Sequence, residues 1–318
     1  MPGDQGNAVI GNMQEEAKLQ PKKQEENAEI DSFSPRKLVS LIFYIDKLPL
    51  YQKEKPFFLN FPVSAPGQRQ SNVSHSRHEV TFTDVRGHED LFSLDTTGFQ
   101  YIHFQTSLRY ENFASPATIE GVFLAEVEAF LTANLGADHV LAWDYQVRRR
   151  DPTLPTNHRG RPGKAQPFRS VHCDESARAA MRRLGHFYPD LAETYRGCRV
   201  QILNFWKPLV GPVQDAPLAL CDYRTVAPGD RVPTDIVFPD YLGETYNFWA
   251  NPQHRWYYME GQLATEALIF KCFDTEAFKN DSIAQFSPHV SFLYPNRDPD
   301  NTFFRESIEV RTYVFYKE

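Results

Sequence analysis

The sequence lacks several features that would place it in a common class of protein. It has four cysteines in 318 residues, and none of them forms the C-x-x-C spacing of a zinc site or a redox motif. No run of about 18 apolar residues is present, which argues against a membrane-spanning helix. Acidic residues outnumber basic ones, 41 to 34, which argues against nucleic acid or a membrane surface as the main partner. We therefore expect a cytoplasmic protein with reduced cysteines.

The first 33 residues differ in composition from the rest of the chain. They contain few large apolar side chains and many Gln, Glu and Lys residues, so they cannot bury enough apolar surface to offset the entropy lost on ordering. We expect a flexible tail, and it lacks the apolar region of a signal peptide. Residues 34–318 are predicted to form a single domain, a length that one β-rich domain can reach.

Short runs rich in β-branched and aromatic residues dominate the chain after the tail. Examples are KLVSLIFYI (37–45), HVLAWDYQVRRR (139–150) and RVQILNFW (199–206). Further runs follow at roughly regular spacing with turn residues between them, as in sandwiches and barrels. The predicted fold is mostly β with flanking helices, and a double-stranded β-helix of the jelly-roll or cupin type accounts for it most economically.

Two segments have the periodicity of helices. The stronger is 117–137, which ends at Gly136, and a second at 175–195 is broken around Gly185 and Pro189. In the first segment the following apolar residues recur at helical spacing: Val122, Phe123, Val127, Phe130 and Leu131. These helices are expected to pack outside the β-structure.

A long basic loop, DPTLPTNHRGRPGKAQP (151–167), precedes the most informative motif of the chain. Loops of this length are often lids over a site, and a surface insert is an equally good interpretation. The adjoining basic run RRRD (148–151) is expected to be a solvated strand end.

The motif itself is FRSVHCDES (168–176), in which His172 and Asp174 are separated by one residue. Residues i and i+2 of a strand point to the same face, so the imidazole and the carboxylate would lie together while Cys173 points away. One His and one Asp are two of the three protein ligands in the 2-His-1-carboxylate triad of non-haem Fe(II). The pattern is weak alone, because such pairs also occur as hydrogen-bonded polar residues at strand ends.

Two histidines remain as candidates for the third ligand. His254 lies in a turn, in NPQHRWYY, whereas His289 enters a strand near the end of the chain, in FSPHVSFLYP. In an iron-binding jelly roll the H-x-D strand and a late strand are neighbours, so we favour His289. The alternative for either is a hydrogen-bonded turn histidine.

A possible anchor for a carboxylate follows His289 by sixteen residues, in RESIEVR (305–311). Arg305 and Ser307 share a face of an extended strand, and together they offer a guanidinium fork and a hydroxyl. That is what is needed to hold the distal carboxylate of 2-oxoglutarate. Arg311 and Glu309 share the same face, so Arg311 remains an alternative anchor, and Glu309 is expected to neutralise one of the two arginines.

Candidate pocket residues follow from their position in strands alone. Asn204 and Trp206 share one strand face, and Trp256 and Tyr258 share another. Aromatic residues at alternate strand positions more often belong to the core. Lys271 stands in the apolar run ALIFKCFD, where pairing with Asp274 or Glu266 is favoured over binding a substrate carboxylate.

Several of these stretches resemble one known family. The chain from about residue 140 onward is similar to the fungal hydroxylase/desaturase family typified by AsaB, which is itself similar to CmcJ and to gibberellin-desaturase-like proteins. The resemblance is carried by NFWKPLVGPVQDAPLALCDYRTV (204–226), HRWYYME (254–260), EALIFKCFD (266–274), SPHVSF (287–292) and RESIEVR (305–311).

The resemblance implies a non-haem dioxygenase that uses Fe(II), 2-oxoglutarate and O₂ on a small secondary metabolite, with hydroxylation, desaturation or ring closure as the outcome. It gives His172, Asp174 and His289 the role of metal ligands and Arg305 that of binding the cosubstrate. The stretch NRDPDNT (296–302) lengthens the gap between His289 and Arg305, which keeps the choice between Arg305 and Arg311 open. A non-redox metal-binding cupin is the alternative. A methyltransferase lacks support, because no Gly-rich loop follows a strand.

Overall fold

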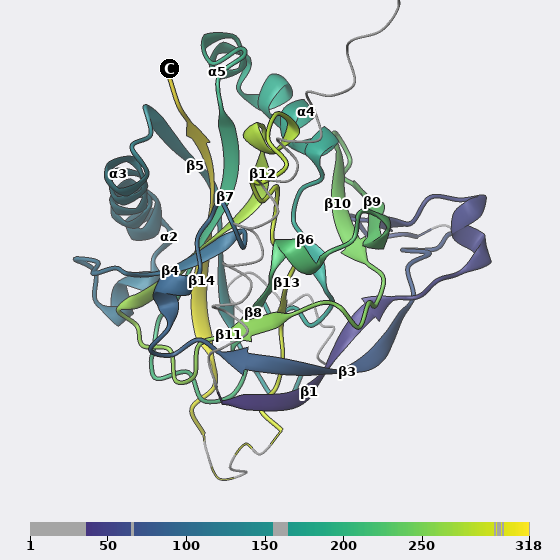
Figure 1. Cartoon of the computed structure of the whole chain (residues 1–318), viewed down its shortest axis with the longest axis horizontal. Coiled ribbons are helices and arrows are strands. Elements are labelled where there is room, and N and C mark those ends of the chain that lie inside the picture. The colour runs from purple at the N-terminus through teal and green to yellow at the C-terminus, as the bar shows by residue number, and fades with distance from the viewer. Residues whose placement is uncertain are drawn as a thin grey trace, which may run out of the picture. The chain divides into compact units, whose positions relative to one another are not determined.

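Two β-sheets build most of this computed structural model, which describes residues 36–64, 67–154, 165–295, 297, 300 and 302–317 (Figure 1). Within these residues, the larger sheet has nine strands in the order β1 (Lys37–Ile45), β3 (His75–Asp84), β11 (Trp256–Tyr258), β8 (Leu218–Cys221), β13 (His289–Ser291), β6 (His172–Cys173), β10 (Leu242–Phe248), β9 (Arg231–Val237) and β2 (Phe57–Leu59). The smaller sheet has five, in the order β4 (Phe99–His103), β12 (Glu266–Asp274), β7 (Val200–Pro208), β14 (Glu306–Phe315) and β5 (His139–Arg149).

Neighbouring strands come from distant parts of the sequence. In the smaller sheet, for example, β14 runs antiparallel between β5 and β7. Side chains of this sheet reach Asp174, which directly follows β6 of the larger one: Asn204 on β7 and Arg311 on β14 both bind its carboxylate. The two sheets therefore face each other, and the predicted mostly-β jelly roll is confirmed.

The outer face of the smaller sheet is apolar and is covered by a helix. We define the outer apolar cluster by its buried members on α3 and the turn before it, on β7 and on β14: Phe123, Val127, Leu131, Leu203, Phe205, Ile308, Val310 and Val314. Figure 1 shows α3 (Leu124–Leu135) beside β5. Along β7, Leu203 and Phe205 join this cluster while Asn204, between them, turns to the other sheet, as the period of two in a strand requires.

The helices begin and end close to their predicted limits. Helix α3 ends at Gly136, whose φ of 63° is the left-handed conformation that glycine adopts readily. Before it lie α2 (Pro116–Thr118) and a π-helical turn at Ile119–Phe123. Val122 lies in that turn and is 37% exposed, whereas its neighbour Phe123 is buried. The second helical segment is α4 (Ala177–Phe187) and α5 (Pro189–Thr194). It breaks before Pro189, as predicted, because proline suits the first turn of a helix, but the predicted break at Gly185 is absent, since Gly185 lies inside α4.

The chain divides into two units, Met1–Arg36 and Lys37–Glu318, and both sheets belong to the second. The predicted flexible tail at 1–33 lies outside the described residues, as does much of the 151–167 loop, and the single domain at 34–318 stays a prediction. Within the described ranges, no helix has both the length and the apolarity needed to cross a membrane.

Candidate metal centre

The shortest strand of the larger sheet positions two of the candidate ligands. Strand β6 lies between β13 and β10, and His172 is paired across the sheet with His289. Directly paired residues in neighbouring strands have side chains on the same face, so both imidazoles point toward the smaller sheet. Their ring centroids are 4.2 Å apart. Asp174 follows β6 and points the same way, which brings together three side chains that are far apart in the sequence.

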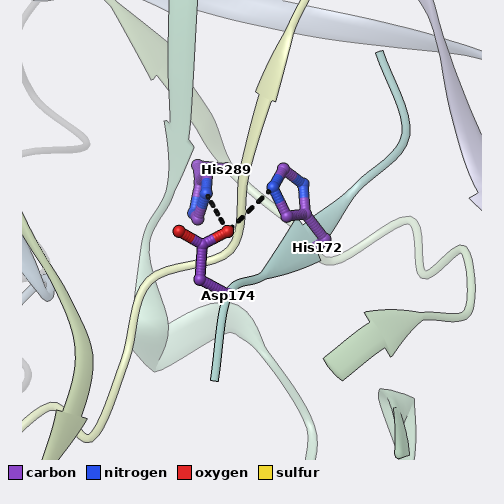
Figure 2. Close-up of side chains that lie close together, drawn as sticks. All are labelled: His172, Asp174 and His289. Carbon is purple, nitrogen blue, oxygen red and sulfur yellow. Dashed lines mark ion pairs between the residues drawn. The ribbon is translucent and has the colours of Figure 1, made fainter. Parts of the chain in front are cut away.

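The three side chains converge on a common point (Figure 2). Oδ1 of Asp174 lies 3.3 Å from Nε2 of His172 and 3.8 Å from Nε2 of His289. One ligand atom from each residue lies within 4.8 Å of the other two. Metal–ligand bonds of about 2.1 Å place neighbouring ligand atoms of an octahedral ion about 3 Å apart. The spacing therefore fits a metal ion held on one face.

Both imidazoles are oriented for binding a metal through Nε2. Nδ1 of His172 lies 2.9 Å from the carbonyl oxygen of Ser170, and Nδ1 of His289 lies 3.2 Å from that of Ser287. A carbonyl only accepts, so each Nδ1 carries the proton and each Nε2 presents a lone pair. Nε2 of His289 is buried and has no hydrogen-bond partner among the described residues. Such an unpaired buried atom is costly unless a ligand fills the position.

The two carboxylate oxygens of Asp174 have different partners. Oδ1 faces the histidines, whereas Oδ2 accepts hydrogen bonds from Nδ2 of Asn204 and Nε of Arg311, each at 2.8 Å. Burial alone would raise the pKa of Asp174, but the charge of Arg311 and the contacts with both histidines hold it well below its ordinary value. Burial, followed by the charge of His289, lowers the pKa of His172. The site therefore favours a carboxylate and a neutral imidazole, which are the forms that bind metals.

Arg305 and Ser307 lie in the interior, and some of their polar atoms have no hydrogen-bond partner among the described residues. Arg305 is 4% exposed, and its Nη1 donates to the carbonyl oxygen of Ala216 at 2.8 Å and to Oγ of Ser291 at 3.1 Å. Its Nε and the Oγ of Ser307 have no partner among the described residues. The guanidinium lies over the ring of Trp206, with Cζ 5.6 Å from the ring centroid.

Arg311, the alternative anchor, is already surrounded by carboxylates. Besides Asp174, it binds Oδ2 of Asp144 at 2.5 Å through Nη1 and Oε1 of Glu309 at 3.4 Å through Nη2. Glu309 therefore pairs with Arg311, the arginine that also binds Asp174. No described carboxylate lies within ion-pair distance of the Arg305 guanidinium.

The two predicted pairs of pocket residues lie in different places. Trp206 shares the inner face of β7 with Asn204. Trp256 and Tyr258 instead point to the opposite face of the larger sheet from His289. Tyr257 shares the face of His289, because both residues pair with Leu220 of β8. Sequence inspection missed Tyr257, because all three residues of β11 are aromatic and no polar position marks a face.

Two other candidate residues belong to the structural core. The His254 ring lies between Tyr44, 3.0 Å from Nδ1, and Asp230, 3.1 Å from Nε2. Both of its nitrogens are therefore occupied. Lys271 pairs with Asp274 at 2.6 Å and with Asp95 at 2.7 Å. The favoured structural pairing of Lys271 with Asp274 is thus present, and its charge is compensated inside the protein.

Comparison with known proteins agrees with this geometry. A family model described as "Oxidoreductase/YMDC permease-like domain" matches residues 42–315. The chain is 32% identical over 263 residues to the Fe(II)/2-oxoglutarate-dependent dioxygenase nvfI of Aspergillus novofumigatus, covering 79% of this chain and 87% of that one. It is 33% identical over 261 residues to the hydroxylase/desaturase CTB9 of Cercospora beticola, covering 75% and 76% of the two chains.

A solved structure shows the same architecture. A variant of the iron and alpha-ketoglutarate-dependent endoperoxidase NvfI superposes with a TM-score of 0.78 at 29% identity, covering 90% of this chain and 99% of that one. The similarity thus covers most of the chain. The chain belongs to the family of fungal Fe(II)/2-oxoglutarate-dependent dioxygenases and hydroxylase/desaturases.

Proposed function

We propose that His172, Asp174 and His289 hold Fe(II) and that Arg305 and Ser307 anchor the distal carboxylate of 2-oxoglutarate. The observation that carries the proposal is the convergence of two Nε2 atoms on one carboxylate oxygen, with each Nδ1 held by a backbone carbonyl. Two imidazoles and one carboxylate on a single face leave positions open on a metal ion, as in non-haem iron oxygenases.

The position of Arg305 supports its role as the anchor in preference to Arg311. Its Nη1 binds Oγ of Ser291, which lies two residues from His289 in β13. Two residues of a strand span about 6.6 Å, which is the scale of a five-carbon dicarboxylate reaching from the metal to the arginine. The unpaired Nε of Arg305 and Oγ of Ser307 are donors that a carboxylate would satisfy. Arg311 instead orients Asp174.

Iron, 2-oxoglutarate and O₂ together supply an oxidant able to attack an unactivated C–H bond, with succinate and CO₂ as the products of the cosubstrate. The protein orients the metal ligands and excludes water. Asn204 and Arg311 fix the rotamer of Asp174. The rings of Phe270 and Phe168, each with its centroid 4.6 Å from that of a histidine ligand, form apolar walls beside the metal position.

The substrate is proposed to be a small secondary metabolite, which is hydroxylated, desaturated or closed into a ring. Relatives carry the names hydroxylase/desaturase and endoperoxidase, so one iron centre serves several outcomes. Trp206 is proposed to line the cosubstrate end of the pocket. A cytoplasmic location is part of the proposal, supported by the free thiols of Cys173, Cys221 and Cys272 in the interior.

Coupled consumption of 2-oxoglutarate and O₂, with formation of succinate, tests the proposal against the non-redox cupin alternative. Iron-loaded protein should consume both in equal amounts, and His289→Ala should consume neither. His254→Ala is the matched control, because the His254 ring is also buried but is bound by Tyr44 and Asp230 and belongs to no proposed metal ligand set. A metal-loaded parent protein that consumes neither reactant would refute the proposal.

A further inference from the structure

Arg148 on β5 lies beside Ser307, one of the two residues of the proposed cosubstrate anchor. Arg148 is paired in register with Ser307 on β14. In the same two strands Arg311 is paired in register with Asp144, and its guanidinium reaches Asp174 beside the larger sheet. Because strand side chains alternate, Arg148 and Ser307 share the inner face with Arg311. Arg149 points outward and pairs with Glu306.

Arg148 has little to compensate its charge. Its Nη1 donates to the carbonyl oxygen of Gln166 at 3.0 Å, and no carboxylate lies within ion-pair distance among the described residues. Burial lowers the pKa of Arg148, and the largest opposing effect is the charge of Glu309, which is already paired with Arg311. Burial, and then the charge of Arg148, lower the pKa of Arg305 to about 9. Two arginines thus repel each other across Ser307.

Two other cations in the described interior are compensated by carboxylates, although a third, Lys207, is not. Lys271 has Asp274 and Asp95, and Arg311 has Asp174. Leaving the half-buried guanidinium of Arg148 beside the buried one of Arg305 without a carboxylate is costly. The unpaired Oγ of Ser307 between them and the unpaired Nε of Arg305 are two further donors with no acceptor. A group of cationic and neutral donors without an acceptor is typical of an anion-binding site.

We propose that Arg148 and Arg305 together hold the distal carboxylate of 2-oxoglutarate, with Ser307 between them. A carboxylate has two oxygens and about four acceptor directions, enough for two guanidiniums and a hydroxyl. The inference rests on the proposed function, and it adds a second arginine from the edge strand β5 to the anchor on β14. The alternative is that Arg148 binds an anionic group of the substrate.

The test compares two keto acids that differ only at the distal end. Binding of 2-oxoglutarate and of 2-oxopentanoate, which carries a methyl group in place of the distal carboxylate, is measured anaerobically by calorimetry in the Fe(II)-loaded protein. Arg148→Gln should weaken 2-oxoglutarate about 10- to 100-fold and change 2-oxopentanoate by less than about twofold. Arg149→Gln, the outward neighbour, should change neither.

Three outcomes would overturn the inference. Equal weakening of both keto acids would indicate damage to the metal site, and unchanged binding of 2-oxoglutarate would leave Arg148 to the substrate or to the fold. Equal binding of both keto acids by the parent protein would mean that the distal carboxylate of 2-oxoglutarate is not recognised by charge. A parent protein that binds neither keto acid would instead refute the proposed function itself, so the two failures are distinguishable.

Thermal stability without ligands gives a second readout. If Arg148 serves the ligand, Arg148→Gln removes a repulsive charge, and the melting temperature of the metal-free protein should be equal to or higher than that of the parent. With Fe(II) and saturating 2-oxoglutarate under nitrogen, the order should reverse. A melting temperature that falls equally with and without ligands would assign Arg148 a structural role through Gln166 and would contradict the proposal.

Discussion

The two faces of the smaller sheet are built from the same strands but carry opposite chemistry. On β7, Leu203 and Phe205 pack into the outer apolar cluster under α3, whereas Asn204, between them, binds a candidate metal ligand on the inner face. On β14, Val310 packs outward and Arg311 binds Asp174. Stability and chemistry are therefore separated by a single residue step along each strand. Substitutions on the two faces should have separable effects.

The largest effect is expected at the centre of the inner face. Asp174→Ala removes the only carboxylate of the triad, so iron affinity should fall by at least about 1,000-fold, beyond the 10- to 100-fold loss typical of residues behind the ligands. Asp144→Ala is the matched control, because Asp144 also binds Arg311 but does not reach the histidines. Iron retained by folded Asp174→Ala protein, measured by metal analysis after gel filtration, would contradict the ligand assignment.

The outer face should respond in stability instead. Phe205 is fully buried, so Phe205→Ala should lower the free energy of unfolding by about 3–5 kcal/mol, measured by urea denaturation. The folded fraction should bind iron and 2-oxoglutarate as the parent does. Val122→Ala, at an exposed position just before α3, should stay within about 0.5 kcal/mol. A selective loss of 2-oxoglutarate binding in Phe205→Ala would show that the two faces are not independent.

The cosubstrate anchor gives the next effect. Arg305→Gln should weaken 2-oxoglutarate binding about 30-fold or more, because a buried charged hydrogen bond is lost, and should leave iron affinity nearly unchanged. Arg311→Gln should do the opposite, since Arg311 contacts Asp174 and not the proposed carboxylate position. If Arg311→Gln abolished 2-oxoglutarate binding while Arg305→Gln preserved it, the two arginines would have to exchange roles.

The smallest of the four effects should come from Asn204. Asn204→Ala removes one of two hydrogen bonds to Oδ2 of Asp174, while Arg311 keeps the other. Iron affinity should fall about 10-fold, with little loss of stability. Leu203→Ala, one step along β7, should reverse the pattern and lower stability alone. Equal iron affinity in Asn204→Ala and the parent would show that Arg311 suffices to orient Asp174.

Much of the fold and of the triad could be predicted from local patterns. Strand β1 has its predicted limits of 37 and 45, and the i, i+2 spacing of His172 and Asp174 places both side chains on one side. His289 could be favoured because it enters a late strand, which in a jelly roll lies beside the strand of the H-x-D motif. These features depend on residues close in sequence or on a topology shared by jelly rolls.

Features that depend on register could not be predicted. In WYY (256–258) every position is aromatic, so only pairing with β8 reveals that Tyr257 faces His289. The run of arginines at 148–150 was expected to be solvated, and for Arg148 that expectation is wrong. It points inward because β5 pairs it with Ser307 across the sheet. Long-range register decides which face of the sheet each of these arginines occupies.

The central claim is that this triad binds iron beside a keto-acid anchor. Anaerobic titration of metal-free protein with Fe(II) and then 2-oxoglutarate, followed by visible absorption, tests it most directly. The account predicts a saturable charge-transfer band of the metal–keto-acid complex in the parent protein and none in His172→Ala. A folded, metal-loaded parent protein without the band, or a band of equal strength in His172→Ala, would contradict it.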